Sequence, residues 1–302
     1  MKRPGALALV LHTHMPYVEG FGTWPFGEEW LWEAIATCYL PLLDVLGRAP
    51  ITLSLTPVLC DQLEAPAAIE RCVAFLETVR PESHRLDIEE FRGSGRSELV
   101  GELERSEREY AAAARRLTAI PGGLLAALGR QASWTSAATH AVLPLLASDT
   151  AIDLQVQTGI ASHRRRFGEW GGGFWLPECA YAPWLDGRLE EAGVRHACVE
   201  LTARFGWGDQ RHLAPLRTEA GPVLWPIDRQ TTSLVWSQKG YPAAAGYRSY
   251  HALTPRQHRV WTNQGCPYDR EAAARQAAAH AEDFVARVGQ RLREGGVCVC
   301  AL

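Results

Sequence analysis

Short, uninterrupted apolar runs that end in polar residues are the feature that most constrains this chain. Residues 5–11, 173–176 and 297–302 form such runs. A run of this length without alternation is typical of a strand that is buried on both faces of a parallel sheet, because helices cover both sides of such a sheet. The runs therefore predict a fold in which parallel strands are wrapped by helices.

Helical periodicity fills the segments between these runs. Thr56 and Pro57 suit the cap and the first turn of a helix, and Asp269 suits the cap of another. Residues 205–265 are rich in Gly, Pro, Tyr and Trp and predict long loops with short strands. The alternation of strands and helices predicts an α/β fold built from right-handed βαβ units, and an α/β barrel is one such fold. We expect helices over 31–46, most of 66–130, 149–167, 183–192 and 270–293, and further strands over 51–55 and 195–200.

The composition limits the classes of partner. The 302 residues include 31 basic and 34 acidic side chains, with a formal net charge of −3 and no long run of either sign. This balance argues against nucleic acid or a charged membrane surface as the main partner. The apolar run near the N-terminus ends at His12, so it is too short for a signal peptide, and the sequence has no stretch long enough to span a membrane.

The cysteines and tryptophans carry further information. The eight cysteines are scattered without a CxxC pair, which predicts reduced thiols in a cytoplasmic protein and no zinc ribbon. Eleven tryptophans lie mostly in loop-like contexts. Flat indole rings in loops suit stacking on sugar rings, although they also fill cores. The excess of tryptophan is therefore compatible with a carbohydrate ligand.

Three polar positions near the predicted strands are candidates for chemistry. In parallel barrels the catalytic groups lie at the carboxyl ends of the strands. His12 and His14 follow the first strand and point to the same side, which suits a metal ion or sugar hydroxyls. Glu178 follows the run 173–176 between Pro177 and an aromatic-rich loop, where a nucleophile or acid/base would stand; it could instead cap the next helix. His140 is a lone histidine that suits either a structural or a functional role.

These residues resemble the motifs of glycoside hydrolase family 57, and within it those of the 1,4-α-glucan branching enzymes. The likeness extends over essentially the whole chain. It is carried by three stretches: the first, HTHMPYV, begins at His12; the second, ATH, ends at His140 and is followed by Leu143 and Pro144; the third, GFWLPECAY, contains Glu178. Ala141 stands where the second motif would have Gly.

The resemblance implies an incomplete, seven-stranded (β/α) barrel of the glycoside hydrolase/deacetylase type, forming a single catalytic domain over 1–302. Such an enzyme cuts an α-1,4 linkage with retention and transfers the chain to a 6-hydroxyl, on a glycogen-type α-glucan and without metal or cofactor. Glu178 would be the nucleophile. His12, His14 and His140 would bind the sugar at the cleavage point, Trp30 and Trp261 would be aromatic platforms, and Tyr241 would lie on a loop that closes over the acceptor.

The end of the sequence departs from the family pattern. A retaining enzyme needs a second carboxyl group about 5–5.5 Å from the nucleophile, and in the family this is an Asp directly after a strand that resembles residues 297–302. No acidic residue follows Glu294. We therefore expect the acid/base Asp and the C-terminal helical region to be absent, so that the chain is the N-terminal portion of a branching enzyme with impaired turnover.

Other functions remain open at this stage. A hydrolytic α-amylase or a 4-α-glucanotransferase of the same family is the nearest alternative. Two histidines after the first strand of a barrel are also typical of metal-dependent hydrolases. In such a site, His140 and Glu178 would be the further metal ligands. A non-catalytic α-glucan-binding protein is the third alternative. The sequence does not determine the oligomeric state.

Overall fold

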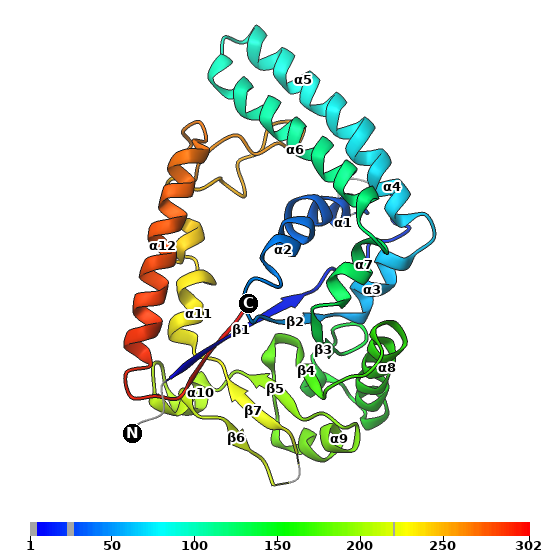
Figure 1. Cartoon of the computed structure of the whole chain (residues 1–302), viewed down its shortest axis with the longest axis vertical. Helices are drawn as coiled ribbons and strands as arrows, with labels where there is room; N and C mark the ends of the chain where they lie inside the picture. Colours follow the sequence, from blue (N-terminus) through cyan, green and yellow to red (C-terminus); the bar gives the residue numbers. More distant parts are fainter. Residues whose placement is uncertain (1–4, 23–26, 220) are drawn as a thin grey trace.

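The computed structural model describes residues 5–22, 27–219 and 221–302. Its centre is a sheet in which seven strands run parallel, with the spatial order β7-β5-β4-β3-β2-β1-β8 (Figure 1). A short eighth strand, β6 (Leu216–Arg217), pairs antiparallel with β7. The parallel strands are β1 (Ala6–Thr13), β2 (Thr52–Leu55), β3 (Ala132–Ser136), β4 (Gly173–Trp175), β5 (His196–Val199), β7 (Val223–Pro226) and β8 (Val297–Ala301).

The sheet curls until its two outer parallel strands, β7 and β8, meet. Ile227, directly after β7, forms a parallel bridge with Val299 of β8, and the amide of Asp228 donates to the Val299 carbonyl over 2.9 Å. The parallel strands therefore form the incomplete seven-stranded barrel that the sequence predicted.

Helices cover the outside of the sheet. After β1 come α1 (Glu29–Ala34) and α2 (Leu40–Val45), and after β2 come α3 (Pro57–Glu64) and α4 (Ala68–Ala74). Two long helices, α5 (Arg80–Gly93) and α6 (Val100–Ala119), pack on each other and project from one end of the molecule (Figure 1). The remaining helices are α7 (Gly123–Gly129), α8 (Asp149–Phe167), α9 (Asp186–Glu191), α10 (Thr202–Phe205), α11 (Arg229–Val235) and α12 (Arg270–Arg291), with short 3₁₀ turns between them.

Two helices widen into a π turn just before a proline. The turns lie at Ile35–Tyr39 and Phe75–Val79, and Pro41 and Pro81 follow two residues later. A proline inside a helix lacks the amide hydrogen and crowds the carbonyl four residues earlier. The wider turn accommodates this defect, so that both helices continue past their prolines.

The apolar side chains form separate layers inside and outside the barrel. The largest cluster packs the outer face of β1 to β3 against α1 to α4, α6 and α7, around Leu53, Leu59 and Leu76. A second cluster, around Phe174 and Ile160, packs β4 and β5 against α8 and α9. Val10, Trp175 and Val299 belong to a third cluster inside the barrel. Burial on both faces explains the uninterrupted apolar runs of β4 and β8.

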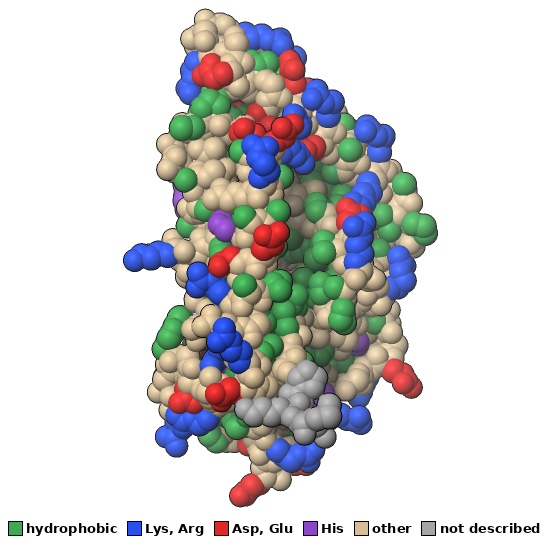
Figure 2. Space-filling view, turned by 60° about the vertical axis from the view of Figure 1, so that its left-hand side comes forward, with side chains coloured by type: hydrophobic (Ala, Val, Ile, Leu, Met, Phe, Trp, Pro, Cys, Tyr) green, Lys and Arg blue, Asp and Glu red, His purple; other side chains and the backbone are tan. Residues whose placement is uncertain are grey.

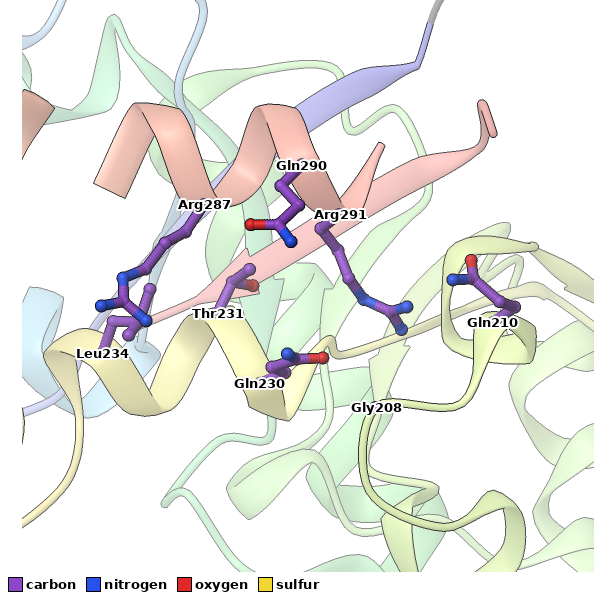
Figure 3. A pocket seen from close by; sticks show the side chains of 8 residues that line it. All are labelled: Gly208, Gln210, Gln230, Thr231, Leu234, Arg287, Gln290 and Arg291. Carbon is purple, nitrogen blue, oxygen red and sulfur yellow. The ribbon is translucent and has the colours of Figure 1, made fainter. Parts of the chain in front are cut away.

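The interior of the barrel wall contains a buried ion pair where β7 meets β8. The guanidinium of Arg291 lies 3.0 Å from the carboxylate of Asp228, and neither side chain is more than 8% exposed. A cavity of about 500 Å³ lies beside this pair, between α11, α12 and the loop that contains Gly208, and Figure 3 shows the polar side chains that line it.

A second cavity lies between helices of the outer layer. Figure 2 shows hydrophobic side chains gathered in a hollow on one face of the molecule. A cavity of about 670 Å³ between α2, α6 and α12 is lined by Leu40 and by small side chains such as Ala113 and Ala273.

Three local features differ from the sequence-based expectations. Strand β3 was not predicted, because its Thr135 and Ser136 are polar; both are buried with their hydroxyls bonded to the carbonyls of Gly159 and Trp175. Helix α11 lies in the segment predicted as loops and short strands, and α10 ends where that segment begins; both are too short to show a helical period. The start of β1 is not buried on both faces, since Leu7 is 38% exposed.

Candidate functional site

The first strand presents two histidines at one end of the barrel. His12 is the penultimate residue of β1, and its ring stacks on that of Trp175 with the centroids 4.3 Å apart and the planes at 4°. Its Nδ1 lies 3.1 Å from the hydroxyl of buried Ser54 on the neighbouring strand β2. These contacts fix the direction in which Nε2 of His12 points. His14, two residues on, lies on the same side of the chain.

His140 comes from the loop after β3 and completes a group of three imidazoles. Its Nε2 lies 2.9 Å from Nε2 of His12, so one ring donates and the other accepts. Its ring stacks on that of His14 with the centroids 4.0 Å apart. His140 has φ 58°, a left-handed backbone that most side chains avoid. The strained loop thus turns the ring back over the end of β1.

Glu178 stands on a strained turn after β4. Glu178 and Cys179 have φ values of 56° and 51°, and the turn closes through the Cys179 amide, which donates to the Leu176 carbonyl over 2.7 Å. Cys179 points inward and is buried, whereas Glu178 is exposed. The turn therefore directs the carboxylate away from the core and into the pocket at the strand ends.

The three imidazoles are uncharged near neutral pH. Burial, with a smaller contribution from the other two rings, lowers the pKa of His12 to about 2. Burial and His140 lower the pKa of His14 to about 4, against an opposing effect of Glu178. Burial also lowers the pKa of His140. Neutral rings offer one N–H donor and one acceptor each, which suits the hydroxyl groups of a sugar.

These four residues line one pocket of about 380 Å³ at the carboxyl ends of the strands. Ala301 and Leu302 at the end of β8 line it too, as do Arg229, Thr232 and Trp236 from α11 and the residue that follows it. Trp236 is 71% exposed, so its ring is available to a ligand in the pocket. The floor is the buried Trp175.

A second carboxylate, Glu200, also lines this pocket from the end of β5. Its Oε1 accepts the amide hydrogen of Thr202 over 2.6 Å, and its Oε2 lies 3.2 Å from Nε of Arg229. The Glu200 amide donates to the Cys179 carbonyl over 3.0 Å. Glu200 therefore ties the turn that carries Glu178 to the neighbouring strand and to α11.

The other three candidates lie outside this pocket. Trp30 lines a separate cavity of about 830 Å³ that also includes Met15, the residue after His14. The Tyr241 hydroxyl donates to Asp283 of α12 over 2.6 Å, and its ring stacks on His280. Trp261 packs edge-on against Phe91 of α5 at 6.2 Å between centroids. The structure thus brings together His12, His14, His140 and Glu178, but not Trp30, Tyr241 or Trp261.

Four charged or aromatic side chains of the pocket were not among the sequence candidates. Trp175 lies three residues before Glu178, inside the motif that carries it, so its proximity could have been anticipated. Arg229 begins α11, a helix that was not predicted, and Trp236 follows directly after it. Glu200 follows the predicted strand 195–200, and the rule that polar residues at strand ends are functional would have found it.

Within the described ranges, no group of three or more His, Cys, Asp or Glu side chains is arranged to hold a metal ion. The alternative of a metal-dependent hydrolase therefore finds no ligand set in that part of the chain. The same ranges contain no helix that is both long and apolar enough to cross a membrane.

Known proteins are similar to this chain in sequence and in architecture. Residues 129–271 match the family model described as glycosyl hydrolase family 57. The chain is 31% identical to the 1,4-alpha-glucan branching enzyme TK1436 of Thermococcus kodakarensis over 343 aligned residues, which cover 96% of this chain and 50% of that protein. It is 33% identical to a probable 1,4-alpha-glucan branching enzyme of Mycobacterium tuberculosis, over 96% of this chain and 60% of that one. The chain thus spans half to three fifths of the length of these curated relatives.

The solved structure of a branching enzyme from Pyrococcus horikoshii superposes with a TM-score of 0.89 at 30% identity, over 99% of this chain and 63% of that one. A parallel barrel with a carboxylate and neutral imidazoles at its strand ends is an arrangement that fits the glycoside hydrolases. More particularly, the chain is similar to members of glycosyl hydrolase family 57 over nearly its whole length.

Proposed function

We propose that this barrel performs retaining glycosyl transfer on α-1,4-glucans and forms α-1,6 branches, with Glu178 as the nucleophile. The observation that carries the proposal is the position of Glu178 on a strained turn, facing one pocket with three uncharged histidines. The relatives of this chain that are named as 1,4-alpha-glucan branching enzymes support the same function. In this reaction the Glu178 carboxylate attacks the anomeric carbon and the α-1,4 bond breaks, while an acid/base group gives its proton to the departing 4-oxygen. A 6-hydroxyl then gives its proton to that same group and displaces Glu178.

The aromatic and imidazole side chains supply the binding in this proposal. His12, His14 and His140 donate to and accept from hydroxyls of the sugar next to Glu178. Trp236 is exposed beside them and stacks on the face of a neighbouring glucose unit. Trp30, Tyr241 and Trp261 lie farther out, and we propose that they contact more distant parts of a long glucan chain.

The acid/base role requires a second carboxyl group near Glu178. Glu200 is poorly arranged for it, since both of its oxygens face donors, the Thr202 amide and Arg229, whereas an acid must present a proton. The place expected for the acid, directly after the last strand, lies at the same pocket, because Ala301 and Leu302 line it. We therefore assign Glu200 to the positioning of Arg229 and of the Glu178 turn.

We propose the cytoplasm as the setting. All eight cysteines are free thiols, which is typical of proteins in a reducing compartment. Glycogen-type glucans would be the substrate there.

An activated donor tests the nucleophile. An α-glucosyl fluoride that carries a second fluorine on the sugar ring has a leaving group that needs no proton donor, so the covalent intermediate can form and persist. We expect mass spectrometry to find one added fluoroglucosyl group on the peptide that contains Glu178, and none in Glu178→Gln. An adduct on Glu200, or an unmodified wild-type protein that still binds glycogen, would contradict the proposal; the second result would favour a glucan-binding protein.

The products on amylose separate the related activities. Branching yields new α-1,6 linkages, visible by nuclear magnetic resonance, with no rise in reducing ends. A rise in reducing ends alone would indicate an α-amylase, and redistributed chain lengths without α-1,6 linkages would indicate a 4-α-glucanotransferase.

A further inference from the structure

The cavity that contains Trp30 holds a second set of residues suited to chemistry. It encloses about 830 Å³ and shares no lining residue with the pocket of Glu178. Its walls come from α1, from the helix that runs through Phe75 into α5, and from the loop around Arg256. The half-buried Ser83 of α5 faces it.

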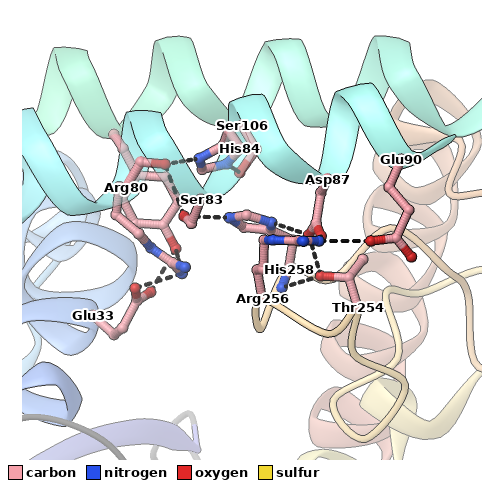
Figure 4. Close-up of polar contacts among 11 residues, drawn as sticks. Glu33, Arg80, Ser83, His84, Asp87, Glu90, Ser106, Thr254, Arg256 and His258 are labelled. Atoms are coloured by element: carbon pink, nitrogen blue, oxygen red, sulfur yellow. Dashed lines mark hydrogen bonds and ion pairs between the residues drawn. The ribbon is translucent and has the colours of Figure 1, made fainter. Parts of the chain in front are cut away.

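Ser83 begins a chain of hydrogen bonds that leads to a buried carboxylate. Its hydroxyl lies 3.1 Å from Nε2 of His258, and Nδ1 of the same ring lies 2.6 Å from Oδ2 of Asp87 (Figure 4). His258 is 3% exposed and Asp87 1%. A hydroxyl, an imidazole and a buried carboxylate connected in this order form the arrangement that activates a serine nucleophile.

The local sequence builds this arrangement from two segments. Ser83 and Asp87 are four residues apart on α5 and therefore lie on one face of the helix. His258 ends a tight turn in which the Thr254 amide donates to the His258 carbonyl and Gln257 has φ 68°. The hydroxyl of Thr254 donates to the Asp87 carboxylate, and Nη1 of Arg256 lies 2.7 Å from it. Asp87 is thus held in place and can orient the ring of His258.

A neighbouring pair shows what the carboxylate adds. The hydroxyl of Ser106 on α6 also lies 3.1 Å from a histidine Nε2, that of His84. Nδ1 of His84, however, lies 2.7 Å from the carbonyl of Arg80 rather than a carboxylate. No negative charge therefore stands behind the His84 ring to stabilise it when it accepts a proton, so Ser106 is a natural control for Ser83.

We propose that Ser83, His258 and Asp87 form a second reactive centre, at which Ser83 accepts an acyl group from a carboxylic ester. The Ser83 oxygen attacks the ester carbonyl carbon while its proton moves to Nε2 of His258. The bond to the alcohol breaks, and the alcohol leaves with that proton. Water then attacks the acyl-serine with the same base, which releases the acid and restores Ser83.

The surroundings of the centre indicate its reactivity and substrate. Burial, His84 and Arg80 lower the pKa of His258 to about 3, so the ring is unprotonated near neutral pH and can accept the proton of Ser83, but it is a weak base. The Ser83 hydroxyl can also donate to the Arg80 carbonyl at 2.8 Å. Both facts favour reaction with activated esters. The rings of Trp30 and Tyr250 line the cavity, so we assign a small acyl group on a flat alcohol as the substrate class.

A fluorophosphonate and p-nitrophenyl acetate test the proposal on the full chain. We expect the fluorophosphonate to modify the wild-type protein at Ser83 at least about 100-fold faster than at Ser106, the lower end of the effect of a positioned base, and to leave Ser83→Ala unmodified. Ser106→Ala, which loses the matched hydroxyl, should react like the wild type. Hydrolysis of p-nitrophenyl acetate should follow the same order.

Equal modification of wild-type protein and Ser83→Ala, modification at another residue, or an unreactive wild-type protein would overturn the proposal. Thermal unfolding of both variants shows whether Ser83→Ala remains folded, and the Ser83→Cys variant gives a second readout. In a folded Ser83→Cys protein, the thiol next to His258 should react with iodoacetamide faster than the exposed Cys38 and Cys266; a slower reaction would count against activation by His258.

Discussion

The uncharged state of the three histidines is a property of their packing. His12 lies between Trp175, Ser54 and His140, and a proton on its ring would place a cation in an apolar wall beside two further imidazoles. Each ring that stays neutral in the folded protein becomes an ordinary histidine on unfolding. The cluster that suits sugar hydroxyls therefore also makes the fold sensitive to acid.

The pH dependence of stability tests this property. The pKa of His12 is about 2 in the folded protein against 6.5 for an ordinary histidine, so below about pH 6.5 the unfolded chain binds a proton that the folded chain does not. Stability should therefore fall as the pH falls from about 6.5, by up to about 1.4 kcal/mol per pH unit from His12. The slope of unfolding free energy against pH gives the number of protons taken up on unfolding. Measured with urea between pH 7 and 5, this number should be smaller by about one in His12→Asn. An unchanged slope would contradict the lowered pKa, because it would show that His12 takes up its proton as readily in the folded protein as in the unfolded chain.

The candidate site residues were predictable where they lie at the end of a recognisable strand. His12, His14 and Glu178 follow apolar runs, and the pocket contains all three. Trp30, Tyr241 and Trp261 came from resemblance alone, and they lie outside the pocket. Trp30 belongs to α1, and the positions of Tyr241 and Trp261 depend on how their loops pack on α12 and α5. The position of Trp236 depends on α11, for which the sequence carries no period. Local pattern thus predicts residues on strands better than residues on loops.

At the scale of elements, the fit of α8 on β3 depends on one glycine. Gly159 lies inside α8, and a methyl group added there would come within 2.1 Å of the Ser136 carbonyl oxygen. The same stretch of α8 accepts the hydroxyl of Thr135 at the Gly159 carbonyl. The close approach explains how a strand with polar, buried side chains is satisfied by the helix that covers it.

Replacement of this glycine should separate α8 from β3. We expect Gly159→Ala to lower the free energy of unfolding by at least about 2 kcal/mol, because the helix must move away from a backbone atom. Gly289→Ala in α12, where nothing lies within 4 Å, should be neutral or stabilising by about 0.5–1 kcal/mol. Urea denaturation of both variants makes the comparison. A Gly159→Ala protein as stable as Gly289→Ala would show that the two elements are not packed this closely.

Among the elements, strands and long helices were predictable, and β3 and α11 were not. The expected helix 149–167 is α8 to the residue, and Asp269 caps α12 by accepting the Ala272 amide. Strand β3 has no apolar run, because hydrogen bonds to carbonyls rather than apolar contacts satisfy its buried face. Periodicity detects apolar burial, so it misses an element that is buried through polar contacts.

At the scale of the molecule, the barrel depends on the junction of β7 with β8. One bridge joins the strands there, and the side chain of Asp228 connects three further parts of the fold. It pairs with Arg291 of α12, and it accepts the hydroxyl of Thr231 at the start of α11 over 3.0 Å. Arg291 in turn donates to the carbonyl of Asp209. Since α11 and β8 both line the Glu178 pocket, this junction also sets one wall of the site.

Removal of the charge of Asp228 should therefore weaken the whole fold. In Asp228→Asn the shape is retained, but the guanidinium of Arg291 remains buried without a counter-charge, which typically costs about 3–5 kcal/mol. The matched change Asp283→Asn affects a pair with Arg287 whose side chains are 42% and 56% exposed, and water screens such a pair, so stability should hardly change. Urea denaturation of both variants, followed by tryptophan fluorescence and far-UV circular dichroism, gives the two free energies. Equal stability of the two variants would mean that β7 and β8 are held together without the ion pair.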